Sequence, residues 1–117
     1  MLLNEITYES ARPIDSYGPG FFRIAGKVIW GDVLITPWYS GPWGGFQDCE
    51  RILSLAENID VLFLGMGAEI SHAPSAFRGQ IEAAGIGLEV MNSPAACRTY
   101  NVLLSEGRRI AVALTKI

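Results

Sequence analysis

Two short stretches combine features that could bind an anionic small molecule. The turn Gly65–Gly67 leaves an apolar run and could bring backbone N–H groups close to an anion. The stretch Asn92–Cys97 is predicted to open a helix, whose first-turn N–H groups are free to receive a carboxylate or a phosphate. The candidate ligand-binding residues are Gly65, Met66, Gly67, Ser93, Ala95, Ala96 and Cys97.

Both stretches also have a purely structural interpretation. Glycine after a strand is common in tight turns, and the first stretch lacks the third glycine of a dinucleotide-binding fingerprint, because Ile70 stands at that position. It also lacks the Gly-Lys-Ser/Thr ending of a nucleotide P-loop. In the second stretch, Ser93 can satisfy the free N–H groups itself as a helix cap. Binding and plain structure both stay open.

Cys97 and His72 are the one pair that could support covalent catalysis. Cys97 lies in the first turn of the predicted helix, a position that lowers the pKa of a thiol. His72, the only histidine, would have to act as its base. The alternative is an inert buried thiol and a solvated loop histidine, and nothing in the spacing requires the two to meet. Two cysteines and one histidine do not cluster as metal ligands, so neither a metal nor a cofactor is predicted.

A loop rich in aromatic residues, glycine and proline extends from Pro37 to Gln47. One interpretation is that its aromatic side chains fold back over the edge of the core. The other is a surface that docks a protein partner, since Trp and Tyr are enriched at interface hot spots. The candidate partner-binding residues are Trp38, Tyr39 and Trp43.

The elements that must position these residues are clearest in the second half of the chain. A helix is predicted from Ser93, with Pro94 at its first position and Gly107 just past its last turn. Within it, Asn101 is a poor helix former that can bond the backbone of a neighbouring loop. The strand Arg109–Leu114 alternates large residues with alanines, which lets a helix approach the alanine face.

Further strands and helices precede this helix in alternation. A helix is expected from Cys49 to about Asn58 with the thiol on its buried face, and a covered strand over Asp60–Leu64. A short helix around Phe77–Ala84 and a strand over Ile86–Met91 follow. If the strands ending at Leu64 and Met91 are parallel neighbours, the two candidate binding stretches meet at one edge of the sheet. This alternation predicts an α/β fold with helices on both faces of the sheet.

The first third of the chain is predicted to be a small antiparallel β-meander. A short strand is expected near Ile6–Tyr8, followed by loop, and then three strands within Phe21–Thr36. Gly26-Lys27 and Gly31-Asp32 separate these strands and suit type II′ turns. The whole chain, residues 1–117, is expected to form a single domain.

Composition excludes several classes of partner. The formal charge is −3, which gives no basic field for nucleic acid or anionic membrane surfaces. No stretch approaches the ~20 apolar residues of a membrane span, and no signal-peptide core is visible. Two cysteines without framework spacing favour a reducing compartment. A cytoplasmic protein is therefore expected.

The run EVMNSPAACRTYNVLLSEGRRIAVAL, with IDVLFLGMG upstream, closely resembles the signature of the small proteins classed as domain of unknown function 498. The match covers nearly the whole chain from the meander onward. The resemblance implies a three-layer α/β fold with a mixed central sheet and an added small β-layer, and no established catalytic activity. One family member helps to build mitochondrial respiratory complex I with partner proteins. Where the family commonly has Gly-Thr-Gly, this chain has Gly65-Met66-Gly67, so any contact made by that hydroxyl is absent.

Three functional hypotheses follow from these observations. The leading one, drawn from the resemblance, is a non-enzymatic interaction protein related to assembly of respiratory complex I, with protein partners. The second is a module that binds an anionic small molecule between the Gly65–Gly67 turn and the helix at Ser93. The third is a thiol-dependent enzyme that uses Cys97. The sequence leaves the oligomeric state open.

Overall fold

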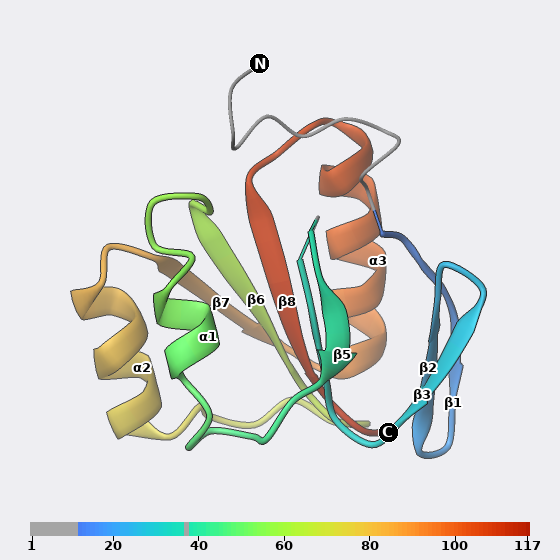
Figure 1. The fold of residues 1–117 in the computed structure, drawn as a ribbon. Helices are drawn as coiled ribbons and strands as arrows, with labels where there is room; N and C mark the ends of the chain where they lie inside the picture. The colour runs from blue at the N-terminus through green and yellow to red at the C-terminus, as the bar shows by residue number, and fades with distance from the viewer. Residues whose placement is uncertain (1–11, 37) are drawn as a thin grey trace.

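The computed structural model describes residues 12–36 and 38–117 and places a mixed five-stranded sheet at the centre of the molecule (Figure 1). In spatial order its strands are β5 (Ser40–Pro42), β4 (Val33–Ile35), β8 (Ile110–Thr115), β6 (Val61–Met66) and β7 (Gly87–Met91). Strands β8, β6 and β7 run parallel, whereas β4 and β5 are antiparallel to their neighbours. The predicted mixed α/β architecture is confirmed.

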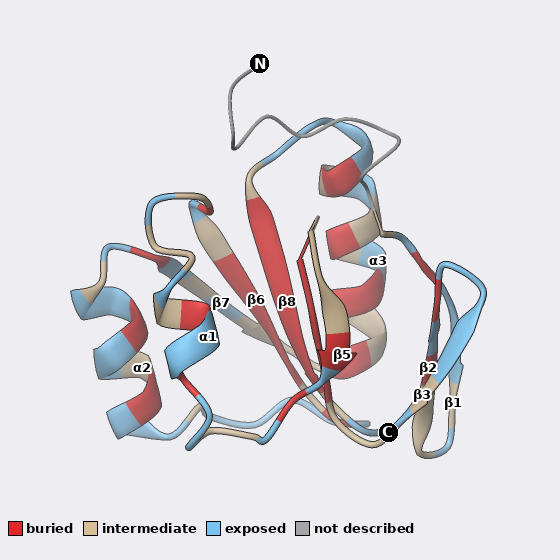
Figure 2. Cartoon of the chain, in the orientation of Figure 1, coloured by how far each residue is buried: buried red, intermediate tan, exposed pale blue. Residues whose placement is uncertain are grey.

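Helices cover both faces of this sheet. Helices α1 (Glu50–Leu53) and α2 (Ser75–Ala83) lie on one face, and α3 (Ser93–Ser105) lies on the other (Figure 1). The central strand β8 is buried along nearly its whole length, so both of its faces are covered (Figure 2). Its large residues Ile110, Val112 and Leu114 belong to the core on the α3 side, and the small Ala111 and Ala113 belong to the core under α1 and α2. This division of β8 agrees with the alternation in its sequence.

A second, three-stranded antiparallel sheet packs beside α3. It consists of β1 (Ile14–Gly18), β2 (Phe21–Ile24) and β3 (Lys27–Trp30). The fully buried side chain of Phe22 reaches the same core as Tyr100 of α3, which joins the small sheet to the rest of the molecule. The small β-layer is therefore present, but its composition differs from the prediction.

Two strand assignments are corrected. The segment Ile14–Gly18, expected to be loop, is strand β1, and the expected third meander strand is β4 of the central sheet. The physical reason lies in burial: Val33, Leu34 and Ile35 are all buried, as a strand covered on both faces requires, whereas β3 is largely exposed. The strand expected near Ile6–Tyr8 lies outside the described residues.

The β2–β3 turn is also one residue away from its predicted place. Ile24 pairs with Lys27, so the loop consists of Ala25 and Gly26, with φ values of 49° and 82°. Two positive φ angles define a type I′ turn rather than the predicted type II′. The carboxylate of Asp15 accepts a hydrogen bond from the N–H of Gly26 at 2.6 Å and helps to hold this turn.

The helices follow the prediction with one shortening. Helix α1 ends at Leu53 rather than near Asn58, and turns occupy the residues between. Helix α2 ends before Gly85, which has a φ of 85°, and α3 ends before Gly107, which has a φ of 75°. Both glycines take the left-handed conformation expected just past a helix.

Candidate functional site

The two candidate binding stretches meet at the carboxyl end of the central sheet, as predicted. Strands β6 and β7 are parallel neighbours, and the N–H of Ser93 donates to the carbonyl of Gly67 at 2.7 Å. In return, the N–H of Gly67 donates to the Ser93 hydroxyl at 2.9 Å. The same hydroxyl donates to the carbonyl of Thr115 at 2.6 Å. One fully buried serine thus links the ends of β6 and β8 to the start of α3.

These contacts occupy the groups that were expected to hold a ligand. Gly67 and Ser93 bond each other, and the N–H of Ala95 donates to the side-chain oxygen of Asn92 at 2.8 Å. The N–H of Ala96 donates to the backbone oxygen of Asn92 at 3.0 Å. An anion at this point would have to displace the Ser93 hydroxyl from the Gly67 N–H. The ligand-binding prediction therefore requires a rearranged loop, and it stays a prediction.

Gly65 shows how closely the two loops approach each other. A Cβ at this position would lie 2.7 Å from the Ser93 Oγ and 2.8 Å from the Ser93 Cα. Such distances are far below an ordinary van der Waals contact, so only glycine fits. The glycine therefore allows strand β6 to approach the start of helix α3. Met66, the middle residue of the turn, is half-buried against the core under α1 and α2.

The helix cap is corrected from Ser93 to Asn92. Asn92 has the extended backbone of an N-cap residue, and its side-chain oxygen accepts the Ala95 N–H. Because the helix begins one residue earlier than predicted, Pro94 is its second residue rather than its first, and it still lies within the first turn. Since both Asn92 and Ser93 are residues that cap helices well, the sequence alone could not decide between them.

Cys97 is buried and does not have the environment of a nucleophile. Its side chain is 2% exposed and packs in the core on the α3 side of the sheet. Burial raises the pKa of the Cys97 thiol to about 12, and this outweighs the lowering effect of the Arg98 charge. The expectation that the helix start lowers this pKa is therefore wrong. Cys49 is also buried, as predicted, and its thiol donates to the carbonyl of Phe46 at 3.2 Å.

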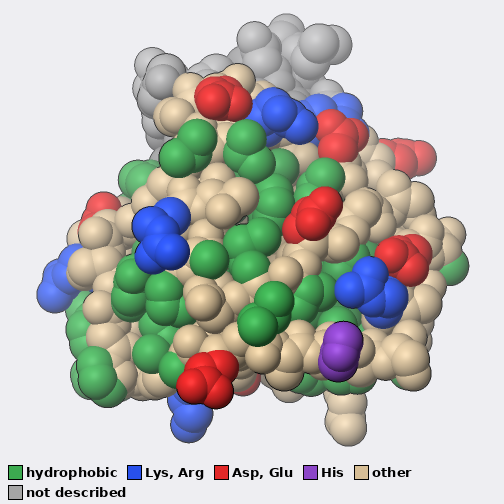
Figure 3. Space-filling model, turned by 180° about the vertical axis from the view of Figure 1, so that it is seen from behind, with side chains coloured by type: hydrophobic (Ala, Val, Ile, Leu, Met, Phe, Trp, Pro, Cys, Tyr) green, Lys and Arg blue, Asp and Glu red, His purple; other side chains and the backbone are tan. Residues whose placement is uncertain are grey.

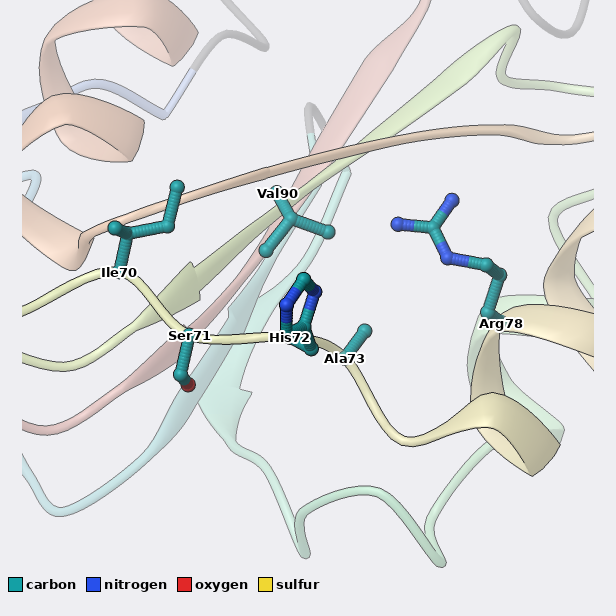
Figure 4. A pocket seen from close by; sticks show the side chains of 6 residues that line it. All are labelled: Ile70, Ser71, His72, Ala73, Arg78 and Val90. Carbon is teal, nitrogen blue, oxygen red and sulfur yellow. The ribbon is translucent and has the colours of Figure 1, made fainter.

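His72 lies in a shallow hollow between the loop after β6 and the edge of β7 (Figure 4). The hollow has a volume of about 310 Å³ and is lined by Ile70, Ser71, His72, Ala73, Arg78 and Val90. We call it the His72 hollow. The His72 ring points into it, whereas Ser71 is turned away. Val90 belongs to the core on the α2 side, opposite the core that holds Cys97, so the proposed thiol and base lie on opposite faces of the sheet.

Of the residues that line this hollow, only His72 was predicted to be a candidate functional residue. In the sequence, Ile70 stands where a dinucleotide-binding fingerprint has its third glycine, and in the structure it is 66% exposed. The available signal was an isoleucine in a predicted loop, where an apolar side chain has no core to enter. The place of Val90 in this hollow could not be predicted from the sequence, because it depends on β7 being the last strand of the sheet.

The aromatic loop divides into a buried and a half-buried part. Trp43 is 5% exposed, its ring meets the Phe77 ring edge to face, and its indole N–H donates to the carbonyl of Asp48 at 3.0 Å. The packing alternative therefore describes Trp43, whose side chain offers no surface to a partner in this conformation. Trp38 and Tyr39 are half-buried, and the Tyr39 ring lies 4.3 Å from the Arg51 guanidinium. Partner binding by these two residues stays a prediction.

The most exposed large apolar side chain among the described residues is Trp30, which the sequence analysis did not single out. It is 70% exposed on the small sheet, and its ring lies 5.3 Å from the ring of Phe21. The pair forms an aromatic surface on β2 and β3. The signal in the sequence was a tryptophan that closes a predicted strand directly before a turn.

Residues 12–36 and 38–117 contain neither a metal-binding cluster nor a membrane-spanning helix. No three His, Cys, Asp or Glu side chains there are grouped to hold a metal ion. None of the helices in that part of the chain has the length and apolar character needed to cross a membrane.

Comparison with known proteins identifies relatives along almost the whole chain. A family model described as "Protein of unknown function (DUF498/DUF598)" matches residues 14–115. An uncharacterized protein of Rhodobacter capsulatus is 48% identical over 114 residues, which cover 97% of this chain and 92% of that protein. The crystal structure of a protein from Bartonella henselae, called an outer membrane protein, has a TM-score of 0.83 at 34% identity and covers 91% of this chain and 95% of that chain.

A second group of relatives carries a functional name. The "NADH dehydrogenase [ubiquinone] 1 alpha subcomplex assembly factor 3" of Danio rerio is 32% identical over 108 residues, which cover 86% of this chain. The match covers 62% of that protein, so this chain spans about three fifths of the length of that relative.

Proposed function

The chain belongs to the family of proteins of unknown function DUF498/DUF598, and from that premise we propose that it is a non-enzymatic interaction protein that assists the assembly of respiratory complex I. The observation that carries the proposal is the match to a named complex I assembly factor over 86% of this chain. The proposal concerns the shared region, because the relative is longer.

Two features of the structure support a role in binding rather than in catalysis. The thiol considered as a nucleophile is buried with a pKa raised to about 12, and the backbone groups considered as an anion site bond each other. The molecule also exposes large apolar side chains, with Trp30 at 70% and Ile70 at 66%. Exposed tryptophan is typical of protein interfaces.

The test is a deletion of the gene in the cell of origin combined with affinity purification of a tagged chain. We expect the deletion to lower the amount of assembled NADH dehydrogenase on native gels, while succinate dehydrogenase, measured in the same gels, stays unchanged. The tagged chain should recover identified NADH dehydrogenase subunits from the cytoplasmic fraction. Unchanged assembly after deletion, with no subunit recovered, would refute the proposal.

Variants can test whether the aromatic loop takes part in this interaction. Trp38→Ala and Tyr39→Ala should reduce subunit recovery if the half-buried part of the loop binds the partner. Val102→Ala is a matched control, because Val102 is 56% exposed on α3 and lies far along the chain from this loop. Equal recovery by all three variants would remove the loop from the proposed interface and leave the assembly role standing.

Binding of an anionic molecule remains a second candidate for one reason only: the two stretches named for it do lie together. A thermal-shift screen of phosphates, nucleotides and carboxylates tests it. A hit should be lost in Ala95→Glu, which places a negative charge in the first turn of α3 and still suits the helix dipole. A screen in which no compound raises the melting temperature would exclude this function.

A further inference from the structure

Among residues 12–36 and 38–117, no strand pairs with the outer edge of β7 in the central sheet. Strand β7 is the last strand in the order β5-β4-β8-β6-β7, and it pairs with β6 along its full length, from Gly87 to Met91. It contains no proline and no bulge in its register with β6. Its open side therefore has the geometry of a template for a further strand.

The direction of the backbone groups on β7 follows from one hydrogen bond. The N–H of Gly87 donates to the carbonyl of Asp60, beside β6, at 2.9 Å. Since backbone groups alternate in direction along a strand, Glu89 and Met91 also face β6, and Leu88 and Val90 face outward. In the part of the chain that the structure describes, no backbone hydrogen bond outside the β6 ladder involves Leu88 or Val90.

The opposite edge of the same sheet is protected. Strand β5 has only three residues and ends in Pro42, which has no N–H to offer. Short length and proline are two of the devices by which proteins prevent pairing at a sheet edge. The contrast within one sheet indicates that the five-residue β7 edge is available for pairing in a way that β5 is not.

The side chains of β7 define what a pairing strand should carry. Leu88 and Val90 are half-buried and point to the α2 side, where Val90 lines the His72 hollow. Glu89 points to the other face and is exposed. Within the described residues, no ion pair closer than 4.0 Å involves Glu89. Figure 3, which views the molecule from the side on which β7 lies, shows hydrophobic side chains gathered in the middle of this face with charged ones around them.

The charge of Glu89 makes a different protein a better pairing partner for β7 than a second copy of this chain. Consider two copies of β7 paired antiparallel about a two-fold axis. If the outward backbone groups of Leu88 and Val90 all form hydrogen bonds, Leu88 of one copy must lie opposite Val90 of the other. That register places Glu89 directly opposite Glu89 of the other copy. Like charges at opposed positions are destabilising, whereas a Lys or Arg at that position would be stabilising.

We propose that the β7 edge pairs with an extended segment of a different protein, which places a Lys or Arg opposite Glu89 and an apolar side chain beside Val90 at the His72 hollow. The main-chain groups of Leu88 and Val90 provide the pairing. The inference deepens the proposed function, since it names the surface and the chemistry through which this chain holds a protein partner.

The probe is a displayed library of random nine-residue peptides selected against the purified chain. Selected peptides are then measured one by one through fluorescence anisotropy. Two substitutions form a matched pair: Leu88→Pro removes an outward N–H, and Leu88→Ala removes the side chain but keeps that N–H. Because this N–H does not face β6, Leu88→Pro should keep the β6 ladder, which circular dichroism checks. Glu89→Lys, at an exposed position, is an independent second test.

We expect selected peptides to alternate apolar and polar residues around one Lys or Arg. Their Kd for Leu88→Ala should stay within about threefold of the unmodified chain, and their Kd for Leu88→Pro should rise about tenfold through the lost hydrogen bond. Glu89→Lys should weaken the basic peptides about fivefold and favour the same peptides with Glu in place of the basic residue.

Three results would overturn the inference. The first is a selection that enriches no peptide, and the second is a set of peptides that bind the Leu88→Pro and Leu88→Ala variants equally well. The third is a dimer of the unmodified chain, detected by sedimentation, that the Leu88→Pro substitution dissociates. Failure of the proposed function is recognised separately in the deletion strain. A NADH dehydrogenase defect that the Leu88→Pro chain fully restores would refute the β7 site and keep the assembly role.

Discussion

Asn101 on α3 bonds both backbone polar groups of Ile14 at the start of β1. Its side-chain oxygen accepts a hydrogen bond from the Ile14 N–H at 2.9 Å, and its side-chain nitrogen donates to the Ile14 carbonyl at 2.7 Å. The amide thus acts as a strand neighbour would, across 87 positions of sequence. This pair joins the small sheet to α3, the helix that covers one face of the central sheet.

Replacing Asn101 should loosen the small sheet. Asn101→Leu leaves the N–H and carbonyl of Ile14 without partners, and we expect the free energy of unfolding to fall by about 2 kcal/mol. Asn101→Asp keeps the acceptor and should cost less. Urea denaturation gives the stability, and the hydrogen-exchange rate of the Ile14 N–H should rise in Asn101→Leu. Val102→Ala, on the exposed side of α3, should change stability by less than about 0.5 kcal/mol; an equal loss in this control would contradict the assignment.

Ser93 should matter more for stability than the residue that caps its helix. Ser93→Ala leaves the Gly67 N–H and the Thr115 carbonyl without this partner, and we expect a loss of about 2–4 kcal/mol. Asn92→Ala removes the cap and should cost about 1 kcal/mol. Both losses are measured by urea denaturation. A larger loss in Asn92→Ala than in Ser93→Ala would show that capping, and not the link between strand ends, is the main contribution at this helix start.

The sequence predicted those parts of the fold that depend on local signals. Proline near the start and glycine past the end located α3, because both residues restrict or permit the backbone directly. The alternation of large and small residues along Ile110–Leu114 predicted which face of β8 each residue covers. Even the bond of Asn101 to a neighbouring segment was predictable, since an amide in mid-helix needs a reason to be there.

The rest depended on which segments meet in space. Whether an apolar run such as Val33–Ile35 joins one sheet or another is decided by the strand that pairs with it, here β8, nearly eighty residues later in the chain. The role of Ser93 depended on Gly67 and Thr115, which no local pattern connects to it. For the candidate site, the meeting of the two stretches was predictable from the strand alternation, but the fact that they fill each other's space was not.

Two glycine substitutions should change stability in opposite directions. In Gly65→Ala the new methyl group would lie 2.7 Å from the Ser93 Oγ and 2.8 Å from the Ser93 Cα, so the strand and the helix must separate. We expect a loss of about 1–3 kcal/mol from this overpacking. In Gly79→Ala, within α2, no atom of the described residues lies within 4 Å of the new Cβ, and alanine should stabilise the exposed helix by about 1 kcal/mol. Thermal unfolding of both variants checks the signs, and a stabilised Gly65→Ala would mean that the two loops are more open than described.

The buried thiol of Cys97 makes the last prediction, which concerns alkaline pH. Its pKa is raised from the ordinary 9.0 to about 12 by burial, so at neutral pH it forms about a thousandfold less thiolate than an exposed cysteine. Between pH 9 and 12 the unfolded chain loses this proton while the folded chain keeps it. The contribution of this thiol to the free energy of unfolding is therefore fully present below pH 9. Above pH 9 that contribution falls by up to about 1.4 kcal/mol per pH unit.

Measurement of unfolding by urea at a series of pH values tests this sign. We expect the decline above pH 9 to be shallower in Cys97→Ala, which has no thiol to ionise at this position, even though the variant starts from a lower stability. Iodoacetamide at pH 7.5 should label Cys97 in the folded chain no faster than global unfolding exposes it, whereas urea-unfolded protein should react at the rate of a free cysteine. Two results together would contradict this prediction: rapid labelling of Cys97 in the folded chain, and a decline of stability above pH 9 that is as steep in Cys97→Ala as in the unmodified chain. They would mean that the thiol reaches solvent, and they would support covalent chemistry at the start of α3.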